Sequence, residues 1–159
     1  MASIRQLFLA HQAQTTNFPL GLEVEKAEGM YLYTPEGKKI LDLIAGISVC
    51  NLGHRHPAVV KAIKEQVDQY MHIMVYGEYI QSPQARLAKA LHDILHPSLD
   101  NVEFVNSGTE GIEGAMKLAK RYTGKPNFVA FQQSYHGSSQ GALSVIGDEV
   151  FRRNYRPLL

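Results

Sequence analysis

The sequence predicts an α/β protein, and three features carry this prediction. Short apolar runs separated by turn residues fill residues 21–43, which is typical of a small antiparallel sheet. Three later stretches have apolar residues at helical spacing. Residues 102–131 form a strand, helix and strand pattern of the size expected for a right-handed crossover in a parallel sheet. We therefore expect a small antiparallel sheet, followed by the start of a larger, mostly parallel one.

The predicted N-terminal sheet rests on alternation and on turn chemistry. Pro35, Glu36 and Gly37 supply a turn between two apolar runs. Residues 45–57 are rich in glycine and histidine and are expected to form a loop. The apolar positions that alternate with polar ones are Leu22, Val24, Met30, Leu32, Ile40 and Leu41.

Three amphipathic helices follow in the sequence. The first is expected from Pro57 to about Tyr70, because proline is favoured at the first helical position. The second begins at Pro83 and ends near Pro97. The third starts after Ser107 and stops at Gly124, with cations in its C-terminal half, where the helix dipole favours them.

The third helix opens on a candidate anion site. The sequence Asn106-Ser107-Gly108-Thr109-Glu110 follows the apolar run 102–105, which is predicted to be a short strand. A strand that turns through glycine into a helix leaves its first backbone N–H groups without partners, at the positive end of the dipole. A phosphate is the natural ligand for such a site.

A purely structural explanation of the same residues stays open. Ser107 and Glu110 have the spacing of a capping box, in which their side chains satisfy the helix's own N–H groups. Gly108 counts against capping as the whole explanation, because glycine there costs about 1 kcal/mol of helix propensity relative to alanine. That cost is easier to understand if a ligand approaches the backbone.

A second candidate element lies one crossover later. Residues 128–131 are predicted to be a short buried strand, and Tyr135, His136 and Gly137 come just after it. In open α/β sheets, ligands bind beyond the carboxyl ends of the strands. Neither dinucleotide nor P-loop signatures are present, so the phosphate belongs to another kind of ligand.

Composition excludes several classes of partner. The chain has 159 residues, 45% of them apolar, and 16 basic against 15 acidic side chains give a formal charge of +1. Such a balance favours neither nucleic acid nor a membrane surface. A single cysteine and the lack of an apolar leader predict a cytoplasmic protein. His54 and His56 lack further ligands nearby, so we expect no metal site.

Several motifs in order resemble class III aminotransferases, which are pyridoxal-phosphate enzymes of fold type I. They include Ser107-Gly108-Thr109-Glu110 with Glu113, and Tyr135-His136-Gly137. The upstream segments 33–42 and 46–57 are similar to the same family, so the likeness runs from about residue 21 to residue 147. It implies the N-terminal part of this fold, with residues 1–74 contributing to the small domain and 75–159 beginning the large cofactor-binding domain.

The resemblance also assigns roles to residues. Gly108 and Thr109 are expected to give backbone N–H groups to the phosphate of pyridoxal 5'-phosphate, with the Thr109 or Ser107 hydroxyl adding a bond. Tyr135 is expected to stack on the cofactor ring, and His136 to lie beside the ring plane. The implied reaction transfers an amino group between an amino acid or amine donor and a 2-oxo acid.

The resemblance further implies that this chain alone is inactive. In the family, the Schiff-base lysine and the aspartate at the ring nitrogen lie beyond the position of residue 159, so no catalytic residue is expected here. The expected partners are a missing C-terminal half, a second copy in a homodimer, and small amino and oxo acids. The alternative is a non-catalytic phosphate-binding or interaction module built on the same half-fold.

One position departs from the nearest branches of the family. The acetylornithine and ornithine branches have an arginine after the aromatic-His-Gly element, and in the acetylornithine type it binds the substrate α-carboxylate. Ser138 stands at this position. A serine cannot make the bidentate clamp of a guanidinium group, which argues against acetylornithine as the substrate.

Overall fold

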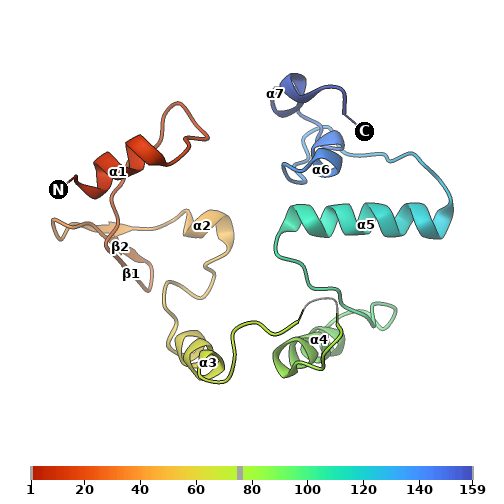
Figure 1. Ribbon diagram of the computed structural model, residues 1–159, viewed down its shortest axis with the longest axis horizontal. Coiled ribbons are helices and arrows are strands. Elements are labelled where there is room, and N and C mark those ends of the chain that lie inside the picture. The colour runs from red at the N-terminus through yellow and green to blue at the C-terminus, as the bar shows by residue number, and fades with distance from the viewer. Residues whose placement is uncertain (1, 75–76, 159) are drawn as a thin grey trace. The chain divides into compact units, whose positions relative to one another are not determined.

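The structure, a computed structural model, describes residues 2–74 and 77–158 and divides the chain into two compact units (Figure 1). Unit 1 runs from Met1 to Tyr76 and unit 2 from Gly77 to Leu159. The boundary predicted between residues 74 and 75 borders the pair 75–76, which lies outside the described residues. Assigning the units to a small and a large domain stays a proposal. None of the described helices is long and apolar enough to cross a membrane.

Unit 1 contains the predicted antiparallel sheet. Its strands are β1 (Lys26–Glu28), β2 (Tyr31–Tyr33) and β3 (Lys39–Leu41), in the order β1-β2-β3 with both pairs antiparallel. The turn 34–38 joins β2 to β3. In it, the N–H of the buried Thr34 donates to the Lys38 carbonyl, and the Thr34 carbonyl accepts from the Gly37 N–H. The alternation of apolar residues and the Pro-Glu-Gly turn therefore predicted this sheet correctly.

A helix that was not predicted from the sequence precedes the sheet. Helix α1 (Ile4–His11) begins with a complete capping box, in which Ser3 and Gln6 satisfy each other's backbone N–H groups. The Ser-x-x-Gln spacing at residues 3–6 was the available signal for it.

The expected loop 45–57 contains an unusual turn. Residues Ala45–Ser48 form the short element α2, but Ala45, Gly46, Ile47 and Ser48 have φ between 49° and 65°. This is the left-handed region, in which a β-branched residue such as Ile47 is an outlier. Helix α3 (Pro57–Val67) then begins at the predicted proline.

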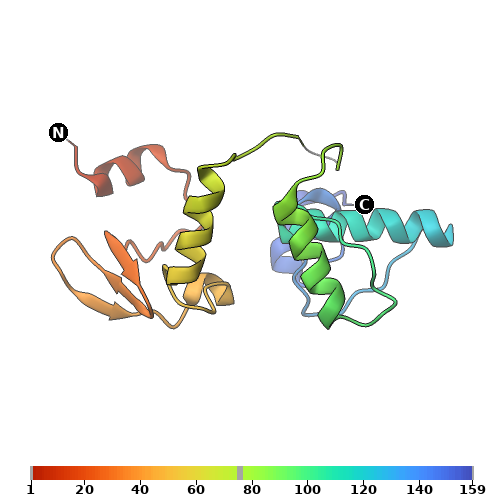
Figure 2. The same cartoon turned by 90° about the horizontal axis from the view of Figure 1, so that it is seen from below.

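Unit 2 is built from helices. Helix α4 spans Ser82–Ile94 and α5 spans Gly108–Thr123, and Gly124 ends α5 in the left-handed conformation. The short elements α6 (Gln140–Ser144), α7 (Glu149–Arg152) and the 3-10 turn η1 (Arg153–Tyr155) follow. Figure 1 and Figure 2 both show α6 at the N-terminal end of α5, and these two helices are in contact. The predicted start and end of α5 are confirmed, and those of α4 are confirmed within three residues.

The two strands predicted in this unit do not form. Neither 102–105 nor 128–131 belongs to a sheet, and the three strands of unit 1 are the only ones among the described residues. The segment 128–131 is not buried either, because Val129 is fully exposed and Phe131 is 87% exposed. A strand needs a neighbour for its backbone hydrogen bonds, and no described segment lies in register with either stretch.

The buried core is correspondingly small. Among the described residues, Ala142, Leu143 and Ile146 are the buried apolar side chains, all in or just after α6. Large apolar side chains elsewhere stay in contact with solvent, including Ile80, Phe18 and Tyr122 at 89% or more exposure. An apolar surface of this extent is typical of a region that packs against further protein.

Candidate functional site

The first turn of α5 forms the capping box that the sequence allowed. The Ser107 hydroxyl accepts a hydrogen bond from the Glu110 N–H at 3.4 Å. The Glu110 carboxylate accepts from the Asn106 N–H at 2.7 Å and the Ser107 N–H at 3.0 Å. This part of the motif therefore stabilises the helix itself, as the structural explanation required.

Two backbone N–H donors in the first turn of α5 take no part in the capping box. The N–H groups of Gly108 and Thr109 make no hydrogen bond with any part of the chain that the structure describes. Both lie at the positive end of a 16-residue helix. A Cβ at Gly108 would meet no atom within 4 Å, and its φ does not require glycine. Nothing in the described chain therefore requires glycine at position 108, and no described atom occupies the space where its Cβ would lie.

The second candidate element lies against the same turn of α5. Gly137 is buried, its φ is 125°, and a Cβ there would overlap the Cβ and Oγ1 atoms of Thr109. Two residues later, Ser139 Oγ lies 2.6 Å from Thr109 Oγ1, and the Ser139 N–H donates to Thr109 Oγ1 at 3.3 Å. The structure thus brings Thr109 together with the segment that carries Tyr135 and His136.

The hydroxyl hydrogen of Thr109 is already used in a hydrogen bond within the chain. The Ser139 hydroxyl donates its single hydrogen to Glu113 Oε1 at 2.6 Å, because a carboxylate can only accept. In the contact between the two hydroxyls, Thr109 must therefore be the donor and Ser139 the acceptor. The Ser107 hydroxyl only accepts in its capping bond, so its hydrogen remains free. Of the two hydroxyls expected to bind phosphate, Ser107 is the one able to donate.

Tyr135 and His136 are placed differently from each other. The Tyr135 ring is 63% exposed, stands edge-on to Phe151 at 5.8 Å between centroids, and its hydroxyl lies 3.1 Å from Ser138 Oγ. More than half of this side chain is thus open to solvent. His136 is half-buried and makes no hydrogen bond with the described residues. No hydrogen bond joins either side chain to residues 107–109 within this part of the chain.

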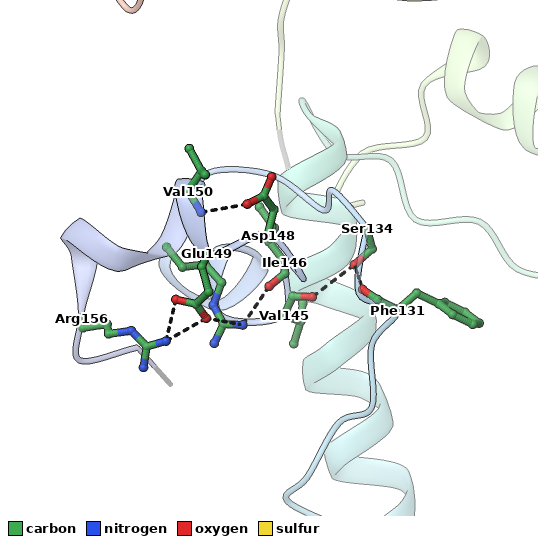
Figure 3. Close-up of polar contacts among 9 residues, drawn as sticks. Phe131, Ser134, Val145, Ile146, Asp148, Glu149, Val150 and Arg156 are labelled. Carbon is green, nitrogen blue, oxygen red and sulfur yellow. Dashed lines mark hydrogen bonds and ion pairs between the residues drawn. The ribbon is translucent and has the colours of Figure 1, made fainter.

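The chain before and after this element is anchored (Figure 3). The Ser134 hydroxyl donates to the Phe131 carbonyl at 2.7 Å and lies 3.5 Å from the Val145 carbonyl. A Cβ at Gly147 would overlap the backbone of Gln132, so the backbones at residues 132 and 147 are in direct contact. Further on, both carboxylate oxygens of Glu149 lie 2.8 Å from Arg156 Nη2. Tyr135 and His136 therefore lie in a loop whose two ends, residues 132–134 and 145–147, are in contact with each other.

Sequence reasoning missed two residues of this arrangement. Ser139 was not singled out, and Glu113 was noted only as part of the family resemblance. Thr109 and Glu113 are four residues apart, so they share one face of α5, which was the available signal. Their common partner is 26 to 30 residues away in sequence, and no local pattern indicates it.

His54 has a structural partner in unit 1. Its Nε2 atom lies 2.7 Å from Asp42 Oδ2, while Asp42 Oδ1 accepts from the N–H groups of Ala45 and Ile44 at 2.9 and 3.0 Å. These bonds hold the left-handed turn, and those of the Ala45 N–H and His54 keep the pKa of Asp42 below its usual value. No group of three or more metal-ligating side chains occurs in 2–74 or 77–158.

Comparison with known proteins identifies the family. The sequence pattern of the family "Aminotransferase class-III" matches residues 11–159. Acetylornithine aminotransferases of Methanopyrus kandleri and Archaeoglobus fulgidus are 42% and 41% identical, over 94% and 86% of this chain. The chain spans only 37% and 35% of their length.

Solved structures agree with this result. Adenosylmethionine-8-amino-7-oxononanoate aminotransferase of Methanocaldococcus jannaschii matches 98% of this chain and 38% of its own, with a TM-score of 0.90 and 30% identity. Taurine:2-oxoglutarate aminotransferase of Bifidobacterium kashiwanohense, solved in complex with PLP and glutamate, matches 91% of this chain and 33% of its own, with a TM-score of 0.81 and 35% identity. This chain therefore belongs to the class III aminotransferase family and spans about a third of the length of these relatives.

Proposed function

We propose that the chain is the N-terminal part of a pyridoxal-phosphate-dependent aminotransferase. The whole protein would transfer an amino group between an amino acid or amine donor and a 2-oxo acid. The observation that carries this proposal is the pair of unpartnered N–H groups of Gly108 and Thr109 at the head of α5. They occur in a chain that belongs to the class III aminotransferase family and resembles an enzyme solved with PLP.

The residues at the head of α5 fit a phosphate group. Two N–H donors, the positive end of the helix dipole and the free hydrogen of the Ser107 hydroxyl all favour an anion. The open space above Gly108 allows the anion to reach the backbone. We assign phosphate binding to Ser107, Gly108 and the N–H of Thr109. The Thr109 hydroxyl is instead assigned to holding Ser139.

Tyr135 and His136 complete the proposed cofactor site. Tyr135 is largely exposed and would stack on the cofactor ring, while its T-shaped contact with Phe151 limits the tilt of its own ring. His136, which has no hydrogen-bond partner among the described residues, lies next to it in the chain and would flank the cofactor ring. When bound, pyridoxal phosphate supplies a carbonyl that accepts the amino group and an electron-withdrawing ring. This chain contributes binding, orientation and exclusion of water.

Other parts of the proposed enzyme come from outside residues 1–159. We infer that the lysine that carries the cofactor and the aspartate at its ring nitrogen lie in a downstream half, consistent with the greater length of the relatives. We further propose a cytoplasmic homodimer. Ser138 gives this site no arginine clamp at that position, so we propose a donor other than acetylornithine, bound through contacts from the remainder of the protein.

The assignment of Gly108 can be tested by adding one charge. Gly108→Asp in the full-length protein places a carboxylate against the phosphate position, and we expect cofactor binding to be abolished. Gly124→Asp is the control for the added charge, which it puts at the other end of α5; a Cβ there meets no atom within 4 Å, although the φ of 69° strains the backbone. Titration of each variant with pyridoxal phosphate, followed by absorbance, measures its affinity for the cofactor. Unchanged affinity in Gly108→Asp would remove this residue from the site.

A second experiment separates the enzyme from the alternative, a non-catalytic phosphate-binding or interaction module. The chain is mixed with the downstream half and pyridoxal phosphate. We expect an imine absorption band near the boundary between the ultraviolet and the visible, and turnover of an amino donor. No band in the reconstituted protein would contradict the proposal. For the isolated chain, we expect no stoichiometric pyridoxyl adduct after borohydride reduction and mass spectrometry, because no lysine here has the family's Schiff-base context.

A further inference from the structure

One carboxylate oxygen in unit 2 accepts three hydrogen bonds from a distant part of the chain. Glu113 Oε1 receives the Ser139 hydroxyl at 2.6 Å, the Gly141 N–H at 2.8 Å and the Ala142 N–H at 3.0 Å. The two amides lie in the first turn of α6, whose N-cap residue Ser139 makes no capping bond with its own side chain. Glu113 therefore caps a helix that follows it by more than 25 residues.

The fit around this carboxylate is close. A Cβ at Gly141 would overlap Glu113 Oε2 and lie 2.8 Å from Cδ, so any other residue at 141 would displace the carboxylate. Gly141 and Ala142 are both buried. The Ser139 hydroxyl, followed by the Ala142 and Gly141 amides and the nearby Lys117, holds the pKa of Glu113 below its usual value. The carboxylate is therefore ionised at neutral pH and acts only as an acceptor.

The same face of α5 makes a second link to this segment. Thr109, one turn before Glu113, donates to the Ser139 hydroxyl and packs directly against Gly137. Ser139 is thus held from two sides, by Glu113 and by Thr109. The two links enclose residues 137–142 and set where the preceding Tyr135 and His136 lie relative to the head of α5.

We propose that Glu113 is a positioning residue of the cofactor site, which fixes the Tyr135–Gly137 segment against the N–H groups of Gly108 and Thr109 by capping α6 and orienting Ser139. This inference rests on the proposed function for the identity of the ligand. Glu113 itself touches neither phosphate nor ring. It acts through Ser139, Gly141 and Ala142.

The first measurement needs no cofactor. Backbone amide chemical shifts of Gly141 and Ala142 are followed by NMR as the pH of the full-length protein is lowered. We expect both amides to titrate together with a midpoint below that of a free glutamate, and this titration to vanish in Glu113→Gln. Amides that do not titrate in the wild type would overturn the inference, whether or not the protein binds pyridoxal phosphate.

The second measurement follows the bound cofactor. In Glu113→Ala we expect the pyridoxal phosphate affinity to fall by about tenfold or more, since charge-assisted hydrogen bonds are lost. The circular dichroism band of the cofactor should also weaken at saturation, because the ring loses its fixed neighbour. Glu113→Gln keeps an acceptor oxygen and should retain the band and an affinity within about fivefold. Glu78→Ala, at an exposed glutamate of the same unit, should match the wild type.

The outcomes separate this inference from the proposed function. A wild-type protein that does not bind pyridoxal phosphate contradicts the function, while the amide titration still decides on Glu113. A Glu113→Ala protein with wild-type affinity and band overturns the inference and leaves the function standing. If Glu113→Ala loses its far-UV circular dichroism signal, it has unfolded, and Ser139→Ala is measured in its place. Ser139→Ala leaves the Gly141 and Ala142 amides bonded to Glu113, and we expect a weaker circular dichroism band of the cofactor. An unchanged band in Ser139→Ala would then overturn the inference.

Discussion

Gly137 offers the sharpest test of how the two candidate elements fit together. Its φ of 125° lies in a region that residues with a side chain rarely adopt. A Cβ at this position would overlap the side chain of Thr109 and lie 2.9 Å from the Thr109 Cα atom. Side-chain rotation cannot relieve that contact, because Cα and Cβ of Thr109 belong to the first turn of α5. Gly137→Ala should therefore push the Tyr135–Gly137 segment away from the helix.

The expected cost has two parts. Backbone strain at such a φ is worth about 1–3 kcal/mol, and forcing an extra methyl group into a close contact costs about 1–3 kcal/mol. The sum, about 2–6 kcal/mol, is a large share of the roughly 5–15 kcal/mol that stabilises a typical domain. Gly124→Ala is the control, because Gly124 has a φ of 69° but a Cβ there meets nothing within 4 Å. It should lose only about 1–2 kcal/mol through strain.

Urea unfolding of the two full-length variants measures the difference between these costs. We expect Gly137→Ala to lose at least about 1 kcal/mol more than Gly124→Ala, the part due to overlap with Thr109. Pyridoxal phosphate affinity should fall in Gly137→Ala and stay unchanged in Gly124→Ala. Equal losses of stability in the two variants would show that Gly137 does not pack against α5, and would refute the reasoning.

Three further outcomes follow from other contacts. Thr109→Val should lower pyridoxal phosphate affinity by less than about fivefold, because the hydroxyl hydrogen is given to Ser139, which Glu113 still holds in this variant; a larger loss in a binding titration would contradict this. The lowered pKa of Asp42 means that the stability it contributes is full above about pH 4, the value of a free aspartate. That stability is lost as the pH falls through the lower folded value, so exchange of the Ala45 amide should accelerate only in acid, and Asp42→Asn should remove this dependence. The isolated chain should associate because of its exposed apolar side chains, and a monodisperse monomer in sedimentation would contradict this.

Local signals in the sequence predicted the helices α3, α4 and α5 and the N-terminal sheet, but not α1, α6 or α7. Proline at residue 57 and glycine at residue 124 mark helix ends through their own backbone chemistry, which needs no partner. The capping box at Ser107 likewise depends on residues three apart. Residues close together in the sequence were therefore enough to locate the head of α5 and to state its two candidate roles.

Features that depend on distant residues could not be predicted in this way. The stretches 102–105 and 128–131 have strand-like composition, but a strand exists only with a partner, and no described segment pairs with them. The left-handed turn at 45–48 contains alanine, isoleucine and serine, none of which favours positive φ; Asp42 and His54 hold it from outside. The cap of α6 by Glu113 has the same origin, since donor and acceptor are 28 and 29 residues apart.

The unpaired stretches 102–105 and 128–131 also bear on how the protein is made. If their partner strands lie in the proposed downstream half, these stretches leave the ribosome before the segments that would cover them have been synthesised. At about 5–20 residues per second, a further hundred residues take on the order of ten seconds to synthesise. During that interval Val129 and Phe131 are exposed apolar side chains on a nascent chain. This part of the proposed enzyme is therefore where we expect chaperones to bind, and the yield of the protein in cells should depend on them and on the speed of translation.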